Sequence, residues 1–129
     1  MLADFASDPL SAAPLDNAAK KRLRLFLAAL VRHRPLLVFW LPTAEPASEL
    51  LYTLVVGDGS LSWDEVDRAS DGLVQALVYQ QEELLADLAV PESCLRELLS
   101  TAVLLHADRD RARPLLSRLQ LLSQAPEKA

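Results

Sequence analysis

The side chains best suited to chemistry gather in residues 57–66, which read GDGSLSWDEV. Asp58, Ser62 and Glu65 offer oxygen atoms at short intervals, and oxygen is the ligand that Ca²⁺ prefers. The same letters also have local structural roles. Asp58 and Gly59 favour a turn, and Ser62 with Glu65 forms the S-x-x-E pattern of a helix capping box. We interpret the segment first as a turn that begins a helix and second as a cation site.

Residues 50–66 also resemble segments of two known families. The residues that carry the resemblance are Asp58, Gly59, Leu61, Ser62 and Glu65. They look like the second half of an EF-hand loop, and with the apolar stretch before them they are similar to the helix–DG turn–helix segment of TerB-like, tellurite-resistance-type domains. By position, the resemblance implies that Asp58, Ser62 and Glu65 are metal ligands in a helical module that responds to divalent cations. The first and third ligand positions fall on Leu54 and Val56, which offer no side-chain oxygen.

The remaining candidates for chemistry lack the spacing of known catalytic sites. His106, Asp108 and Asp110 crowd together near one expected helix end, and Cys94 is the single cysteine. The sequence contains no glycine-rich phosphate loop, nucleophile elbow or HExxH motif. We therefore predict a protein that is not an enzyme, has no catalytic residues and needs no cofactor beyond a weakly bound divalent cation. The lone cysteine fits a reducing, cytoplasmic location.

Composition favours helices. The chain has 129 residues, of which 29 are Leu, 19 are Ala and 3 are Gly, and Ile is absent. This length fits one domain. We predict an all-α bundle of about five helices over residues 16–123, preceded by a flexible lead over residues 1–15 and followed by a flexible tail over residues 124–129.

The expected helices follow from apolar periodicity and from end signals. They span residues 16–33, 47–56, 62–90, 92–107 and 114–123. Asp16 and Ser62 are the expected N-caps of the first and third. The apolar run 36–41 fits a buried strand or a short buried helix. The alternative prediction is therefore an α+β fold, in which residues 36–41 and 50–56 form a hairpin.

Charge is divided along the chain. The formal net charge is -5, with a sequence pI near 4.9, which argues against nucleic acid as a partner. Residues 16–35 nevertheless carry a net charge of +5, whereas residues 45–97 carry -10. The predicted basic surface consists of Lys20, Lys21, Arg24 and Arg32. We expect it to attract the acidic block within the fold or to face water, and not to bind a membrane surface.

The expected helix 62–90 has more apolar surface than one contact face requires. Its second apolar stripe consists of Val74, Val78 and Leu85. Contiguous apolar surface left over after a core is formed is typical of a partner site. We predict a protein–protein interaction module, such as an adaptor, a secretion-type chaperone or an assembly subunit, which binds another protein or itself through this helix face. The alternative function is the cation-responsive module.

Overall fold

The chain contains both helices and strands in the computed structural model, which describes residues 16–42, 51–72, 74–90 and 92–124. The elements of these ranges are α1 (Asn17–Leu30), the 3-10 helix η3 (Val31–His33), β1 (Leu37–Leu41), β2 (Tyr52–Gly57), α2 (Trp63–Ser70), β3 (Gln75–Gln80), α3 (Gln81–Leu88), α4 (Cys94–Ser100), β4 (Val103–Ala107) and α5 (Arg109–Gln124). The prediction of an all-α helical bundle is therefore wrong, and the fold is α+β. The predicted lead 1–15 and residues 125–129 of the predicted tail lie outside the described residues, whereas Gln124 belongs to α5.

The four strands form one mixed sheet in the order β3-β2-β1-β4. Strand β1 is antiparallel to both of its neighbours, and β3 is parallel to β2. Consequently β2, β3 and β4 run in the same direction and end at the same edge of the sheet.

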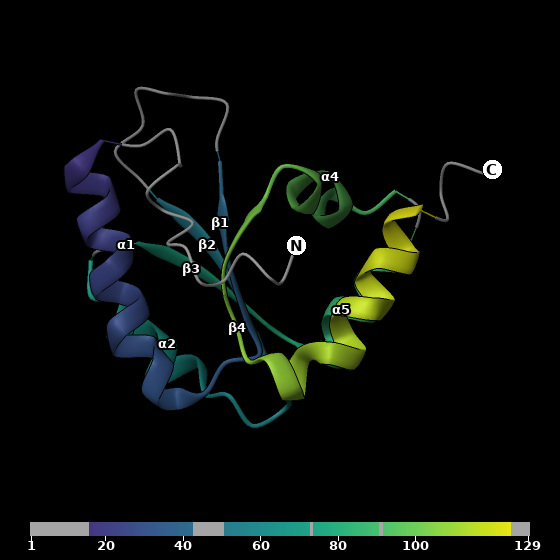
Figure 1. Ribbon diagram of the computed structural model, residues 1–129, viewed down its shortest axis with the longest axis horizontal. Coiled ribbons are helices and arrows are strands. Elements are labelled where there is room, and N and C mark those ends of the chain that lie inside the picture. The colour runs from purple at the N-terminus through teal and green to yellow at the C-terminus, as the bar shows by residue number, and fades with distance from the viewer. Residues whose placement is uncertain (1–15, 43–50, 73, 91, 125–129) are drawn as a thin grey trace.

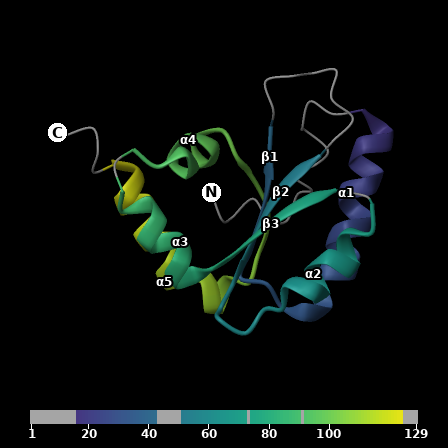
Figure 2. The same ribbon diagram turned by 180° about the vertical axis from the view of Figure 1, so that it is seen from behind.

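Helices cover both faces of the sheet (Figure 1). Helices α1 and α2 lie on one face, and α3, α4 and α5 lie on the other, as the view from behind also shows (Figure 2). Each side has its own apolar core, which we call the first core on the α1 side and the second core on the α3 side. Alternate strand residues supply them: Val38 and Trp40 of β1 belong to the first core, and Leu37 and Leu41 to the second.

Residues 37–41 and 52–56 pair in antiparallel fashion, as in the alternative prediction of an α+β fold. Leu37 lies opposite Val56, and Leu41 lies opposite Tyr52. The predicted helix over residues 47–56 is wrong for its described part, because β2 occupies Tyr52–Gly57, while residues 43–50 lie outside the described residues. A strand that is buried on both faces is a continuous apolar run, and such a run has no period that separates it from a buried helix.

The predicted helix over residues 62–90 is divided into α2, β3 and α3. Asp71 and Gly72 both adopt positive φ angles, 30° and 74°, in the left-handed region that ends α2. Strand β3 begins at Gln75 and pairs with β2 along its whole length. Backbone pairing to a strand that is distant in the sequence thus overrides the helical spacing of the leucines.

The two C-terminal helices also differ from the prediction. The expected helix 92–107 is α4 followed by β4, and α5 begins at Arg109, before Pro114. The predicted caps of the first and third helices are confirmed. Asp16 Oδ1 accepts the N–H of Ala19 at 2.7 Å, and Ser62 Oγ accepts the N–H of Glu65 at 3.4 Å. Within the described ranges, no helix is both long enough and apolar enough to cross a membrane.

Candidate functional site

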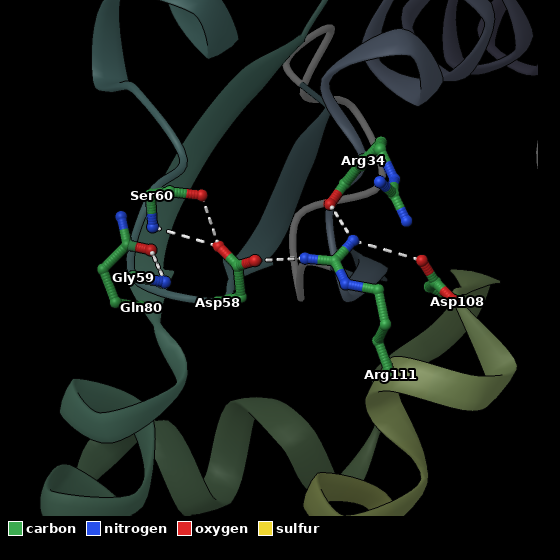
Figure 3. A network of polar contacts seen from close by, with 7 residues as sticks. All are labelled: Arg34, Asp58, Gly59, Ser60, Gln80, Asp108 and Arg111. Carbon is green, nitrogen blue, oxygen red and sulfur yellow. Dashed lines mark hydrogen bonds and ion pairs between the residues drawn. The ribbon is translucent and has the colours of Figure 1, made fainter.

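Polar residues come together where β2, β3 and β4 end (Figure 3). We call this end of the sheet the carboxyl edge. Asp58 follows β2, Gln80 ends β3 and Asp108 follows β4. In open α/β sheets, ligands commonly bind beyond the carboxyl ends of parallel strands. This edge is therefore the first place where a ligand site is expected.

Arg111 of α5 connects three segments at this edge. Its Nη1 donates hydrogen bonds to the carbonyl oxygen of Arg34 at 3.0 Å and to Asp108 Oδ2 at 3.1 Å. Its Nη2 pairs with Asp58 Oδ2. The guanidinium group thus binds the turn before β1, the loop after β2 and the start of α5 (Figure 3). Its charge is engaged with acceptors of the protein itself.

The Asp58 carboxylate is fixed by its own loop. Its Oδ1 accepts the Ser60 N–H at 3.0 Å and the Ser60 hydroxyl at 2.6 Å. These two bonds, from the hydroxyl first and then from the backbone, lower the pKa of Asp58 to about 2, with a smaller contribution from Arg111. The carboxylate is therefore ionised throughout the physiological range.

Gln80 closes the other side of the same loop. Its Oε1 accepts the Gly59 N–H at 2.9 Å, and its Nε2 donates to the carbonyl oxygen of Leu61 at 2.9 Å. A side chain at Gly57 would collide with both neighbours, since a Cβ there would lie 2.5 Å from Leu61 Cβ and 2.6 Å from Gln80 Oε1. The contacts at this edge fasten the loop to the sheet and thereby act as a structural clamp.

The three predicted metal ligands contact different partners. Asp58 contacts Ser60 and Arg111, Ser62 caps α2, and Glu65 Oε2 pairs with His33 Nδ1 at 2.7 Å. In the described part of the chain, no group of three or more His, Cys, Asp or Glu residues is placed to hold a metal ion. Strand β2, not a helix, precedes the turn. Cation binding and the resemblance of residues 50–66 to TerB-like or EF-hand segments stay predictions.

The two other candidates for chemistry are His106 and Cys94. His106 lies opposite Val38 on β4, and burial lowers the pKa of its imidazole against a smaller, opposite effect of Asp108. Cys94 is exposed at the first residue of α4.

The predicted partner-binding residues do not share a helix face. Val74 is buried before β3, Val78 lies in β3 and packs against the first core, and Leu85 lies in α3 and packs against the second core. The sheet therefore separates Val78 from Leu85. Their predicted role in binding a partner stays a prediction, although the continuous helix on which it was based does not exist.

The predicted basic surface lies on two consecutive elements. Lys20, Lys21 and Arg24 belong to α1, and Arg32 belongs to η3. The contact between His33 Nδ1 and Glu65 Oε2 joins this segment to the acidic block at the start of α2.

The feature that the sequence did not reveal is the outer edge of β3. Among the described strands, β3 pairs only with β2, so one side of its backbone has no neighbouring strand. Gln75 N–H bonds the Leu51 carbonyl at 2.7 Å, and the Thr53 hydroxyl bonds the Gln75 carbonyl at 3.3 Å, so both backbone groups of Gln75 face β2. Because this direction alternates along a strand, the backbone groups of Ala76 and Val78 face the open edge.

Comparison with known proteins identifies no relative: no protein-family model, no curated protein and no solved structure matches the chain.

Proposed function

We propose that the protein is a non-enzymatic protein-interaction module that binds its partner by adding an extended strand to the open edge of β3. The observation that carries the proposal is the direction of the backbone groups. Ala76 and Val78 present N–H and C=O groups away from β2, and no other strand of the described residues pairs with them; such a row of backbone groups is a template for another strand. In the view from behind, β3 lies in front of β2, with α3 to one side and α2 to the other (Figure 2).

The sequence of β3 supports this role, because it lacks the devices by which proteins protect sheet edges. QALVYQ contains no charged residue and no proline, and its register with β2 is regular. Leu77, in the middle of the strand, is 41% exposed. At the opposite edge of the sheet, β4 contains an irregularity in its pairing with β1, between the partners of Val38 and Phe39. Bulges of this kind obstruct the pairing of an edge.

The polar cluster at the carboxyl edge supports a binding function over an enzymatic one. Asp58, Asp108 and the Arg34 carbonyl oxygen are all bonded to Arg111. Gln80 is paired with the loop after β2. These contacts give the polar residues a structural role, which is to stabilise the loop. The proposed location is cytoplasmic, as the single cysteine suggests.

Site-directed photo-crosslinking tests the proposal. A photo-reactive phenylalanine derivative replaces Gln75, which is exposed on β3, in the chain expressed in its native host. We expect a crosslinked adduct, and we expect Ala76→Pro to abolish it, because proline removes an outward N–H while leaving the bonds to β2 intact. The control carries the same derivative at Leu98 of α4, which is 38% exposed. An adduct equally strong at position 98, or one that persists with Ala76→Pro, contradicts strand addition.

A further inference from the structure

The open edge of β3 is complementary to itself. We propose that the strand added there is β3 of a second copy, which gives a two-fold symmetric dimer with a continuous sheet across the interface. This inference rests on the proposed function, since it names the partner of the same edge. Cyclic dimers with a self-complementary patch are the commonest oligomers of soluble proteins.

Symmetry restricts the register of such a pairing. Two β3 strands related by an axis perpendicular to the sheet run antiparallel, and residues directly opposite one another point to the same face. Because side chains alternate between the faces, the axis must lie between the two copies of one and the same residue, which are then directly opposite each other. It cannot lie at a level between two successive residues of the strand. We name each axis below by that residue.

The direction of the backbone groups then favours an axis at Leu77 over one at Val78. An axis through Leu77 places Ala76 of each copy opposite Val78 of the other, and these are the residues whose N–H and C=O groups face outward. An axis through Val78 would instead place Ala76 opposite Gln80. The Gln80 N–H is already bonded to Glu83 Oε1 at 3.0 Å, so that register would break an existing bond. The axis through Leu77 keeps it.

The same register covers the exposed apolar side chain of the strand. Leu77 lies opposite its own symmetry copy as a non-hydrogen-bonded pair, in which the side chains approach most closely. It alternates with Ala76 and Val78, which pack against the first core, so it lies on the face of the second core together with Tyr79. The two leucines would thus extend the apolar layer under α3 across the interface.

Charge favours this contact between two copies of an acidic chain. The formal net charge is -5, and two such chains repel one another at most surfaces. Residues 72–81 nevertheless contain no charged residue. The β3 strands can therefore meet along their whole length without placing like charges opposite one another.

Sedimentation velocity of the full chain over a range of concentrations tests the dimer. We expect the wild type to be a dimer at about 100 µM, a concentration well above the dissociation constant of a specific interface. Leu77→Lys places two ammonium groups at the axis, so we expect it to raise the dissociation constant by roughly 100-fold or more. Leu98→Lys is the matched control, since Leu98 is 38% exposed against 41% for Leu77, and it should leave the dimer unchanged.

Hydrogen exchange of the wild type gives a second measurement that needs no variant. The amides of Ala76 and Val78 should become protected as the concentration rises through the dissociation constant, whereas the amide of Gln75, which is bonded to Leu51, should be protected at every concentration. A monomeric wild type, or a dimer without protection of Ala76 and Val78, overturns the inference. If the crosslinker at Gln75 then captures a different chain in a manner sensitive to Ala76→Pro, the proposed function stands alone. If it captures nothing, both fail.

Discussion

Acid should weaken the fold through Asp58. Its pKa is lowered from 3.8 to about 2, so the folded chain holds this proton less tightly than the unfolded chain does. The unfolded state therefore binds more protons between these values, and the stability that the carboxylate supplies is complete above about pH 4 and is lost as the pH falls toward 2. The full shift corresponds to roughly 2.5 kcal/mol. Since 34% of the Asp58 side chain is exposed, solvent screening reduces the expected contribution to about 1 kcal/mol.

Two measurements check this reasoning. An NMR titration of the Asp58 carboxyl carbon should give a midpoint near 2 in the wild type, with a larger upward shift for Ser60→Ala than for Arg111→Met, because the Ser60 hydroxyl is the main cause of the low value. Urea unfolding of the wild type and Asp58→Asn at pH 7 and at pH 2.5 should show a smaller loss of stability in the variant. A wild-type midpoint near 3.8, or a larger effect of Arg111→Met, refutes the assignment of causes.

Other perturbations probe the same edge of the sheet and the interior of β4. Arg111→Met should lower the free energy of unfolding by about 1–2 kcal/mol in urea titrations at pH 7, because it removes charge-assisted bonds at a partly exposed site; a neutral outcome contradicts the clamp. Gly57→Ala should cost about 1–3 kcal/mol in the same assay, since its Cβ has no room beside Leu61 and Gln80. His106 should titrate below 6.5 by NMR, and because burial favours its neutral form, its contribution to stability should decrease as the pH falls below 6.5; a midpoint above 6.5 contradicts this.

The sequence correctly predicted features that depend on neighbouring residues alone. Asp16 and Ser62 cap the helices that follow them, as their residue types indicate, because a side-chain oxygen reaches the backbone only three residues away. The capping-box pattern at Ser62 predicts two contacts, and the structure shows the one from the Glu65 N–H to the Ser62 hydroxyl. The Glu65 carboxylate pairs with His33, which belongs to another element, so a contact between distant segments replaces the local one.

The sheet could not be predicted in the same way, because it depends on partners far along the chain. Val78 and Leu77 fit a helical stripe as well as they fit a strand, and only the pairing of β3 with β2 decides between them. One local signal was present. Asp71 and Gly72 form a pair that tolerates left-handed backbone, and both residues adopt it at the end of α2. Interpreting this pair as a helix end would have separated β3 from α2.

The polar cluster followed from the sequence only in part. Asp58 was interpreted first as a turn residue and second as a cation ligand, and neither interpretation included its contact with Arg111. Arg111 and Gln80 were not identified, since they come close to Asp58 only because β2, β3 and β4 end at the same edge. A carboxylate in a turn therefore gives no indication of its partner until the topology of the sheet is known.

The clamp at the carboxyl edge and the open edge of β3 are connected through Gln80. This residue ends β3, its side chain is bonded to the loop after β2, and its N–H is bonded to Glu83 of α3. These bonds hold the end of β3 in place before any partner arrives. Strand addition is favoured by a rigid template, because less conformational entropy is lost on binding.

Gln80→Ala should therefore weaken the β3 dimer, although Gln80 lies beyond the outward-facing residues Ala76 and Val78. Unlike Leu77→Lys, this substitution introduces no new charge. If the dimer is instead unaffected while Gly59 becomes mobile, the clamp serves the loop alone.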